Sequence, residues 1–286
     1  MTDLPESQEM AVPAVDRAGP PAKISAKAVT RTFGVGSEAL HALGPVDLDI
    51  AEGEFICLVG PSGCGKSTFV RLVAGLLPPT EGQLRVRIRG ASAAPIATVF
   101  QDFGIFPWKT VEANVRFALT ANGVPKREGR ERARQWLARL GLADFGDAYP
   151  DTLSGGMRQR VAIARALATE PEILLMDEPF ASLDAQMRQM LQEDLLRLSQ
   201  TTRPTVVFVT HSLEEALILG DRVIVMSGRP GRVLDETVVP FPRPRSTLVR
   251  ESAEFGALRG RLWGHLKNEV EAQMAAQSGG EMRSLA

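Results

Sequence analysis

The stretch Gly60-Pro-Ser-Gly-Cys-Gly-Lys-Ser67 decides how this chain folds. It fits the pattern G-x-x-x-x-G-K-[ST] and follows a short apolar run, Phe55 to Val59, that is typical of a buried strand. A helical pattern then runs from Lys66 to Leu77, where Pro78-Pro79 is expected to stop it. Glycines let backbone N–H groups turn inward, and the helix N-terminus adds partial positive charge, so the segment predicts a phosphate-binding loop. A glycine-rich turn with a chance Lys-Ser pair is the alternative, and the strand-to-helix context argues against it.

In the predicted loop, side chains bind the nucleotide in addition to the backbone N–H groups. We expect Lys66 to reach the β- and γ-phosphates of a nucleoside triphosphate, and the Ser67 hydroxyl to ligate Mg²⁺. Cys64 is interpreted as a small loop residue rather than a redox centre. The residues assigned to nucleotide contact in this segment are Gly60, Pro61, Ser62, Gly63, Cys64, Gly65, Lys66, Ser67 and Thr68.

Two acids follow a second buried strand. Residues Ile173 to Met176 are all apolar, and Asp177, Glu178 and a proline come directly after them. Parallel strands deliver groups at their carboxyl ends to the ligand crevice, so we expect both acids beside the phosphate loop. Asp177 is predicted to hold Mg²⁺, usually through water, and Glu178 to orient or deprotonate an attacking water as a general base. A solvated acidic turn is the alternative, and the phosphate loop weighs against it.

Strands and helices alternate along most of the chain, which implies an α/β fold with a largely parallel sheet and right-handed crossovers. Further strands are predicted at Val46 to Ile50, Leu84 to Ile88, Ala97 to Phe100, Val206 to Val209 and Val223 to Met226. Further helices are predicted at Met157 to Ala168, Ala185 to Gln200 and Leu248 to Ala276. Residues 102–152 are interpreted as a mostly helical insertion, and residues 240–245 as a proline-rich linker.

Composition excludes several classes of protein. Of 286 residues 44% are hydrophobic and 23% charged, so the chain can bury a sizeable core and is not wholly disordered. Lys and Arg total 33 against 34 Asp and Glu, without the basic excess that non-specific nucleic-acid binding uses. No apolar run reaches the roughly 18 residues of a membrane span. Residues 1–22 have no signal-peptide pattern and are predicted to form a disordered tail.

Residues 153–160, Leu-Ser-Gly-Gly-Met-Arg-Gln-Arg, resemble the signature motif of ATP-binding cassette (ABC) ATPases. The segment places a hydroxyl and two glycines, at Ser154, Gly155 and Gly156, where a helix begins. This makes a second anion site on a chain that already has one phosphate cradle. The resemblance implies that the second site caps the γ-phosphate of an ATP molecule bound to a partner subunit.

Other positions match the family pattern in its usual order. Gln101, at the end of a predicted strand, matches the glutamine that approaches Mg²⁺ and water, so the metal-side set becomes Ser67, Gln101 and Asp177. The segment Ser182-Leu183-Asp184 matches the loop that crosses the dimer interface. His211 matches the switch histidine that contacts the γ-phosphate, and Phe33 stands where the family places an aromatic residue that stacks on adenine.

The resemblance also implies the architecture. It predicts a P-loop NTPase (RecA-like) core with a mainly parallel sheet, an antiparallel β subdomain and an inserted α-helical subdomain. The ATPase domain is expected over residues 23–245, its helical subdomain over about 102–160, and a C-terminal helical extension over 246–286. Three motifs resemble those of nitrate, sulfonate and taurine importer ATPases. They are Phe106-Pro107-Trp108, Gly228-Arg-Pro-Gly-Arg232 and Val239-Pro-Phe-Pro-Arg-Pro-Arg245.

The expected function is ATP hydrolysis, with ATP and Mg²⁺, in an importer of a small anion or sulfonate-like solute. Two copies would form a head-to-tail dimer around two ATP molecules and drive a separate membrane permease. A solute-binding protein would act indirectly, and no nucleic acid is expected. The chain would lie peripherally on the cytoplasmic face of the membrane.

Three rival hypotheses stay open from the residues. A soluble ABC ATPase in DNA repair or translation would typically carry two cassettes or a long coiled coil, and neither pattern is found here. A P-loop kinase or GTPase would not need the motif at residues 153–160. A non-hydrolysing regulatory subunit is disfavoured by the intact set Lys66, Asp177, Glu178 and His211.

Overall fold

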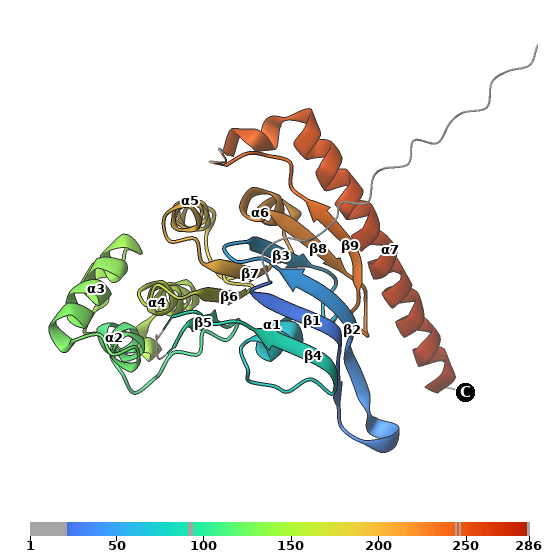
Figure 1. The fold of residues 1–286 in the computed structure, drawn as a ribbon, viewed down its shortest axis with the longest axis horizontal. Helices are drawn as coiled ribbons and strands as arrows, with labels where there is room; N and C mark the ends of the chain where they lie inside the picture. The colour runs from blue at the N-terminus through green and yellow to red at the C-terminus, as the bar shows by residue number, and fades with distance from the viewer. Residues whose placement is uncertain (1–21, 91–93, 244, 246, 285–286) are drawn as a thin grey trace, which may run out of the picture.

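The computed structural model describes residues 22–90, 94–243, 245 and 247–284. Within them the chain forms two sheets with helices packed around and between them (Figure 1). The large sheet has the strand order β5-β6-β7-β3-β8-β9, in which all neighbours are parallel except β8 and β9. The small sheet is antiparallel, with the order β2-β1-β4. The predicted fold class is therefore confirmed.

Most element boundaries lie near those predicted, but β2 begins at Leu40 rather than Val46, and strands β1 and β9 and helix α6 were not predicted. The large sheet contains β3 (Phe55–Val59), β5 (Ile96–Val99), β6 (Ile173–Asp177), β7 (Thr205–Val209), β8 (Arg222–Met226) and β9 (Val233–Val238). The small sheet contains β1 (Ile24–Phe33), β2 (Leu40–Ile50) and β4 (Glu81–Val86). The α-helices are α1 (Lys66–Val73), α2 (Val111–Ala121), α3 (Lys126–Arg139), α4 (Gly155–Leu167), α5 (Ala185–Thr201), α6 (Leu213–Leu219) and α7 (Ala253–Ser284). Short 3-10 helices are η1 (Gly36–Glu38), η2 (Ala143–Phe145), η3 (Pro150–Thr152) and η4 (Thr247–Glu251).

The central strands of the large sheet are buried on both faces, which explains why they are apolar throughout. In β3, Phe55, Cys57 and Val59 join a hydrophobic cluster that continues into α2, α3 and α4. The alternate residues, Ile56 and Leu58, join a second cluster that includes α1 and the small sheet. Strand periodicity thus divides one short segment between two cores.

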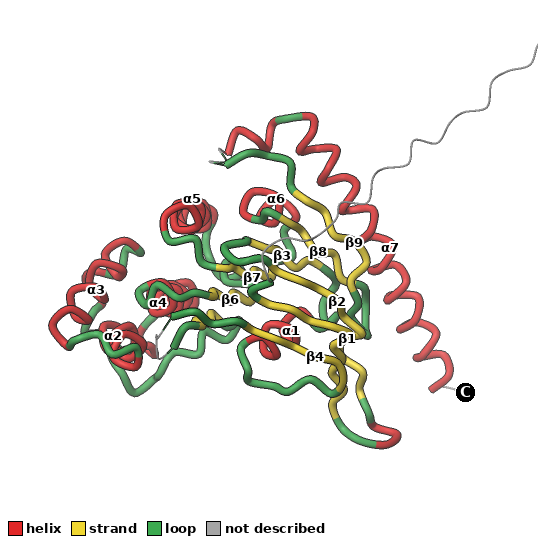
Figure 2. Tube along the Cα trace, in the orientation of Figure 1, coloured by secondary structure: helices red, strands yellow, loops and turns green. Residues whose placement is uncertain are grey.

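The helices cover the sheet in distinct groups. Figure 2 shows α2, α3 and α4 gathered at one side of the molecule, and their mutual packing forms the helical region. Helix α1 packs against strands of both sheets, which places it between them. An inserted helical group is therefore observed, whereas the exact limits of a helical subdomain stay a prediction.

Helix α1 is shorter than predicted, and a glycine ends it. The helix ends at Val73, Ala74 is its C-cap, and Gly75 takes a left-handed backbone conformation with φ 72°. The N–H groups of Leu76 and Leu77 bond back to the carbonyl of Arg71, which closes the last turn. Pro78-Pro79 lies beyond this cap, so the prediction that it stops the helix is wrong.

The described residues of the proline-rich segment, 240–243 and 245, pack on the core and do not form a free linker. Phe241 is buried, with its ring centroid 5.7 Å from that of Phe255 on α7. Arg243 donates to the Asp221 carboxylate at 2.7 Å, and Arg245 donates to the carbonyls of Ile218 and Gly220. The proline-rich composition predicted a linker, but Arg243 and Arg245 supply hydrogen-bond donors that hold the segment against the core.

The C-terminal helix packs through the predicted apolar stripe. Helix α7 begins at Ala253 rather than Leu248, because residues 247–251 form the 3-10 helix η4. Phe255, Leu262 and Leu266 are buried and Leu258 is partly buried, while the side chain of Val270 lies outside the described residues. The helix contacts α6 and β8.

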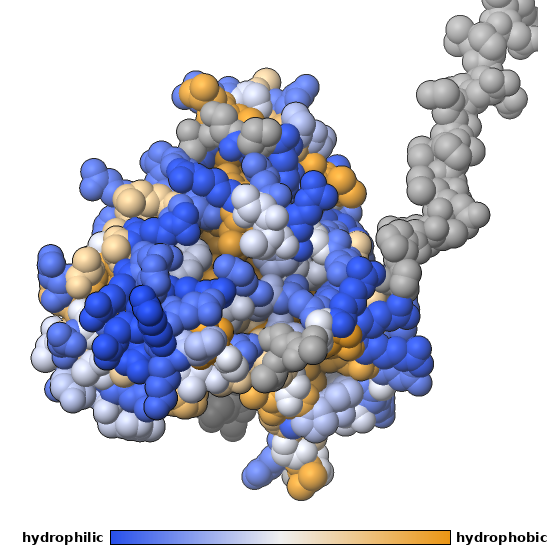
Figure 3. Space-filling view, turned by 60° about the vertical axis from the view of Figure 1, so that its left-hand side comes forward, coloured by the Kyte–Doolittle hydropathy of each residue, from blue (hydrophilic) through white to orange (hydrophobic). Residues whose placement is uncertain are grey.

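The visible surface is mostly polar. Figure 3 shows one face of the molecule on which hydrophilic side chains predominate and hydrophobic residues form separate patches. Among the described residues, none of the helices combines the length and apolar character needed to cross a bilayer. The predicted tail at residues 1–22 lies outside the described part of the chain, apart from residue 22.

Candidate functional site

The carboxyl ends of the parallel strands meet at one edge of the large sheet. The phosphate loop follows β3, Gln101 follows β5, Glu178 follows β6 and His211 follows β7. Together with Phe33 at the end of β1, these segments surround a cavity of about 460 Å³. Its described lining residues are Phe33, Leu40, Ala42, Ser62, Gly63, Gly65, Lys66, Ser67, Thr68, Gln101, Glu178, His211 and Arg229. Leu40, Ala42 and Arg229 were not predicted.

The phosphate loop has a backbone that requires glycine. Gly65 has φ 95°, and a Cβ built on it would lie 2.6 Å from the carbonyl oxygen of Ala42. Lys66 is buried, and its Nζ donates to the carbonyls of Gly60 at 2.8 Å and Pro61 at 2.9 Å. Gly60, Pro61 and Cys64 are buried behind the cavity wall and shape the loop.

The loop is suited to phosphate. Helix α1 begins at Lys66, and the first N–H groups of any α-helix have no acceptor within the helix. These donors, the helix dipole and the Lys66 ammonium give the cavity a positive end. The residues present therefore fit a nucleotide phosphate chain.

Ser67 and Asp177, which were predicted to lie on the metal side of the site, bond to each other. The Ser67 hydroxyl donates to Asp177 Oδ1 at 3.0 Å across the space between α1 and β6. Burial raises the pKa of Asp177; the Ser67 hydrogen bond opposes this rise, and neighbouring Glu178 adds to it. Among the described residues no cluster of three or more His, Cys, Asp or Glu can hold a metal ion. One hydroxyl and one carboxylate suit Mg²⁺, which takes its other ligands from phosphates and water.

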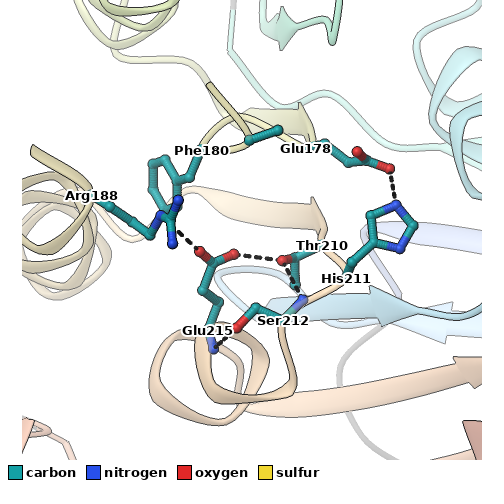
Figure 4. A pocket seen from close by; sticks show the side chains of 8 residues that line it. Glu178, Phe180, Arg188, Thr210, His211, Ser212 and Glu215 are labelled. Atoms are coloured by element: carbon teal, nitrogen blue, oxygen red, sulfur yellow. Dashed lines mark hydrogen bonds and ion pairs between the residues drawn. The ribbon is translucent and has the colours of Figure 1, made fainter. Parts of the chain in front are cut away.

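Glu178 lies between the glutamine and the histidine predicted to act with it. Its Oε1 is 2.5 Å from His211 Nε2, and its Oε2 accepts from Gln101 Nε2 at 3.5 Å (Figure 4 shows the histidine contact). When Glu178 is deprotonated, His211 must carry its proton on Nε2 to bond to it. Glu178 also has φ 49°, a conformation that non-glycine residues adopt mainly where the surroundings impose it.

The signature segment lies away from this cavity. Ser154 caps α4, and its hydroxyl accepts from the N–H of Met157 at 3.3 Å. A Cβ built on Gly156 would lie 3.1 Å from the carbonyl oxygen of Ser182, so the signature adjoins the segment at residues 182–184. None of residues 154–156 lines the nucleotide cavity described here.

A buried carboxylate behind His211 was missed by the sequence analysis. Glu215 Oε2 accepts from Thr210 Oγ1 at 2.5 Å, and Thr210 Oγ1 accepts from the N–H of Ser212 at 3.0 Å (Figure 4). Burial raises the pKa of Glu215, while the Thr210 bond and Arg188 oppose the rise. The pattern Ser212-x-x-Glu215 at a helix start resembles a capping box, which would bond the Glu215 carboxylate to the N–H of Ser212; here Thr210 takes both places, so the pattern does not predict the observed bond.

Arg188 links this carboxylate to the segment beside the signature. It lies 3.7 Å from Glu215 and donates through Nη2 to the carbonyl of Leu183 at 3.0 Å. Arg188 and Glu215 line a second cavity of about 160 Å³, which Glu178 and His211 also line. Glu215 and Arg188 therefore connect the turn that carries His211 to the segment at residues 182–184.

Fold and site together define a P-loop nucleotide-binding protein, in which acids follow parallel strands beside a phosphate loop. The chain matches the family model described as ABC transporter over residues 43–181. It is 43% identical over 244 residues to the taurine import ATP-binding protein TauB of Rhizobium johnstonii, covering 83% of this chain and 93% of that one. It thus belongs to the family of ABC transporter ATP-binding proteins, as predicted.

Two further relatives and a solved structure are consistent with this family membership. Identity is 44% to the nitrate import ATP-binding protein NrtD of Synechocystis sp., covering 77% of this chain and 83% of that one. The chain is also 44% identical to the aliphatic sulfonates import ATP-binding protein SsuB 1 of Pseudomonas fluorescens, covering 89% of this chain and 90% of that one. A dimeric, post-hydrolysis structure of the ATP-binding cassette MJ0796 with ADP and Pi is similar at TM-score 0.70 and 35% identity. It covers 77% of this chain and all of that one.

Proposed function

We propose that this chain is the ATP-hydrolysing subunit of an ABC importer for a small anionic or sulfonate-like solute. The observation that carries the proposal is the position of Glu178, held by Gln101 and His211 at the edge of a cavity with an intact phosphate loop. The import names of the taurine, nitrate and sulfonate relatives support the solute class.

The site residues have separate tasks in this proposal. Lys66 and the N–H groups at the start of α1 bind the phosphates, and Phe33 lines the cavity where it can stack on adenine. Ser67 and Asp177, with Gln101, would hold Mg²⁺, which when bound neutralises phosphate charge. Glu178 accepts a proton from the attacking water, and His211 orients Glu178 through Nε2.

A second copy of the chain completes the site. Ser154, Gly155 and Gly156 form an anion site at the start of α4 but do not line their own chain's cavity. In a head-to-tail pair each signature segment would meet the nucleotide of the other copy. The dimeric state of the similar MJ0796 cassette supports this arrangement.

The permease partner is assigned to a groove between β5, α2 and α4. Its volume is about 330 Å³, and its lining includes Phe106, Phe117 and Ala166. Phe117 is 46% exposed, so the groove presents an aromatic side chain that a partner can cover. The proposed complex lies on the cytoplasmic face of a membrane, and a solute-binding protein acts on it indirectly through the permease.

Affinity purification from detergent-solubilised membranes of the source cells tests the transporter proposal. We expect the tagged chain to recover a polytopic permease, and Phe117→Asp to lose it while still binding MgATP. Phe145→Asp is the matched control, because Phe145 is a similarly exposed aromatic residue of the helical region outside the groove. Recovery of only soluble repair or ribosomal proteins would contradict the proposal and favour the soluble ABC class.

A further inference from the structure

The loop between β8 and β9, residues 227–232, is wedged against the phosphate loop. A Cβ built on Gly231 would lie 1.7 Å from the carbonyl oxygen of Cys64, so only glycine fits there. The N–H of Gly44 donates to the carbonyl of Gly231 at 2.8 Å, which ties the loop to β2 as well. The motif singled out in the sequence, residues 228–232, therefore borders the nucleotide cavity.

Ser227 gives this loop a fixed shape. Its hydroxyl oxygen lies 2.9 Å from the carbonyl oxygen of Gly228 and 3.1 Å from that of Pro230, which share its one proton, and it accepts from the N–H of Arg232 at 2.9 Å. The N–H of Ser227 also donates to the carbonyl of Arg232. A loop closed on its own hydroxyl presents the residue at its tip in a defined position.

That residue is Arg229, and its guanidinium lies over the phosphate loop. Its Nε donates to the carbonyl of Gly63 at 3.4 Å, and its Nη2 lies 3.1 Å from the position that a Cβ on Gly63 would occupy. Arg229 lines the nucleotide cavity and is exposed to it. It forms no ion pair with any carboxylate of the described residues, so its charge is not neutralised by the protein there.

Helix α7 holds the loop from its other side. The Glu269 carboxylate accepts from the N–H of Gly228 at 2.7 Å. A hydrogen bond with a charged acceptor is stronger than one between neutral groups, so this contact restrains the residue that precedes Arg229. The helix thereby reaches the nucleotide cavity through one intermediate loop.

We propose that Arg229 is a nucleotide-binding residue. Its guanidinium adds positive charge and directional donors for the phosphates held by residues 60–67, and Glu269 of α7 keeps it in place. The inference rests on the proposed nucleotide-binding function of the phosphate loop. It assigns Arg229, within the motif at residues 228–232, and Glu269 of the C-terminal helix a role at the nucleotide site.

Calorimetric titration with MgADP tests the role of Arg229 without turnover. Arg229→Ala should weaken binding about five- to twentyfold at low ionic strength, and less in high salt, because salt screens an exposed charge. Arg229→Lys should recover part of the affinity. Arg232→Ala is the matched control on the same loop, since that side chain does not line the cavity and its variant should bind like the unmodified chain. Equal affinities for Arg229→Ala and Arg232→Ala would overturn the proposal, as would a loss that does not depend on salt.

The same titration tests the contribution of α7. Glu269→Ala should weaken MgADP binding about two- to fivefold, because the loop loses its restraint. Glu271→Ala is the control, since Glu271 is exposed and pairs with Lys267 on α7 itself. An unchanged affinity in Glu269→Ala would overturn the role of the helix. Absence of binding by the unmodified chain would instead overturn the proposed function.

Discussion

Asp177 and Glu178 are neighbours in sequence but serve different parts of the site. Asp177 ends β6 and faces Ser67, whereas Glu178 turns toward Gln101 and His211. In an extended strand, adjacent side chains point to opposite sides, which alone would separate the two acids. The separation in the structure has a different cause, because Glu178 leaves the extended conformation with φ 49°.

Glu215→Gln tests whether the buried carboxylate positions His211. The change keeps the side-chain size but removes the charge that faces Arg188 and the strong acceptor for Thr210. We expect kcat for ATP hydrolysis to fall about tenfold with an unchanged KM, since small displacements of a reacting group are costly. Steady-state kinetics measure the split. The control Glu214→Gln alters an exposed residue that pairs with Arg259; equal kcat values for the two variants would refute the positioning role.

Ser154→Arg tests whether the signature acts on another copy's nucleotide. The bulky side chain would block the start of α4, which lies outside the chain's own cavity. We expect the monomer to bind MgATP with unchanged affinity and turnover to be lost. Equilibrium titration and phosphate release measure the two effects. Loss of nucleotide binding by the monomer would contradict action between copies.

The parallel core could be predicted from sequence, whereas strands β1 and β9 could not. The buried strands are uninterrupted apolar runs because both faces pack against other elements. Strand β1 was missed since its alternation is broken near Ala28, which has φ 48° and adjoins a shift in strand register. Strand β9 is an edge strand with the polar sequence Val-Leu-Asp-Glu-Thr-Val, which gives no apolar run to detect.

Leu262→Ala tests whether α7 is part of the packed core. Leu262 is fully buried in the cluster that includes α6 and the sheet. Removing a buried leucine side chain leaves a cavity, so we expect a loss of about 2–4 kcal/mol in the free energy of unfolding. Denaturant titration measures it. The adjacent Trp263 is 59% exposed, and a loss as large for Trp263→Ala would contradict specific packing of Leu262.

Glu172 lies directly before β6 and connects it to the start of β1 and to the segment that follows β4. Its carboxylate bonds to Lys23 and to the N–H groups of Arg89 and Gly90. The Lys23 hydrogen bond is the main cause that lowers the pKa of Glu172 from 4.5 to about 2. The carboxylate therefore stabilises the fold above about pH 4.5, and this contribution is lost as the pH falls toward 2.

Glu172→Gln isolates that contribution. We expect the variant to lose about 1–3 kcal/mol of unfolding free energy at pH 7, the range for hydrogen bonds to charged groups. The difference from the unmodified chain should shrink as the pH falls from 4.5 toward 2. Thermal or denaturant unfolding across this range measures it. A difference independent of pH would show that the charge of Glu172 is not responsible.

The two proposed anion sites lie apart in the molecule. The phosphate loop lies after β3, and the signature begins α4 beside residues 182–184. Sequence motifs predicted both sites and identified the family, because each motif is a contiguous segment with fixed residue types. Arg229, Arg188 and Glu215 escaped prediction because they meet the site only through folding, from a hairpin loop and from two helices.

The most direct test of the central claim is Glu178→Gln in the full chain with MgATP. The amide keeps the size of the carboxylate but cannot accept a proton from water, so turnover should fall about 10²–10⁴-fold, the usual share of a general base. MgATP binding should be retained, and light scattering should detect an ATP-dependent dimer that persists because hydrolysis no longer reopens it. Near-normal phosphate release by this variant would contradict the account.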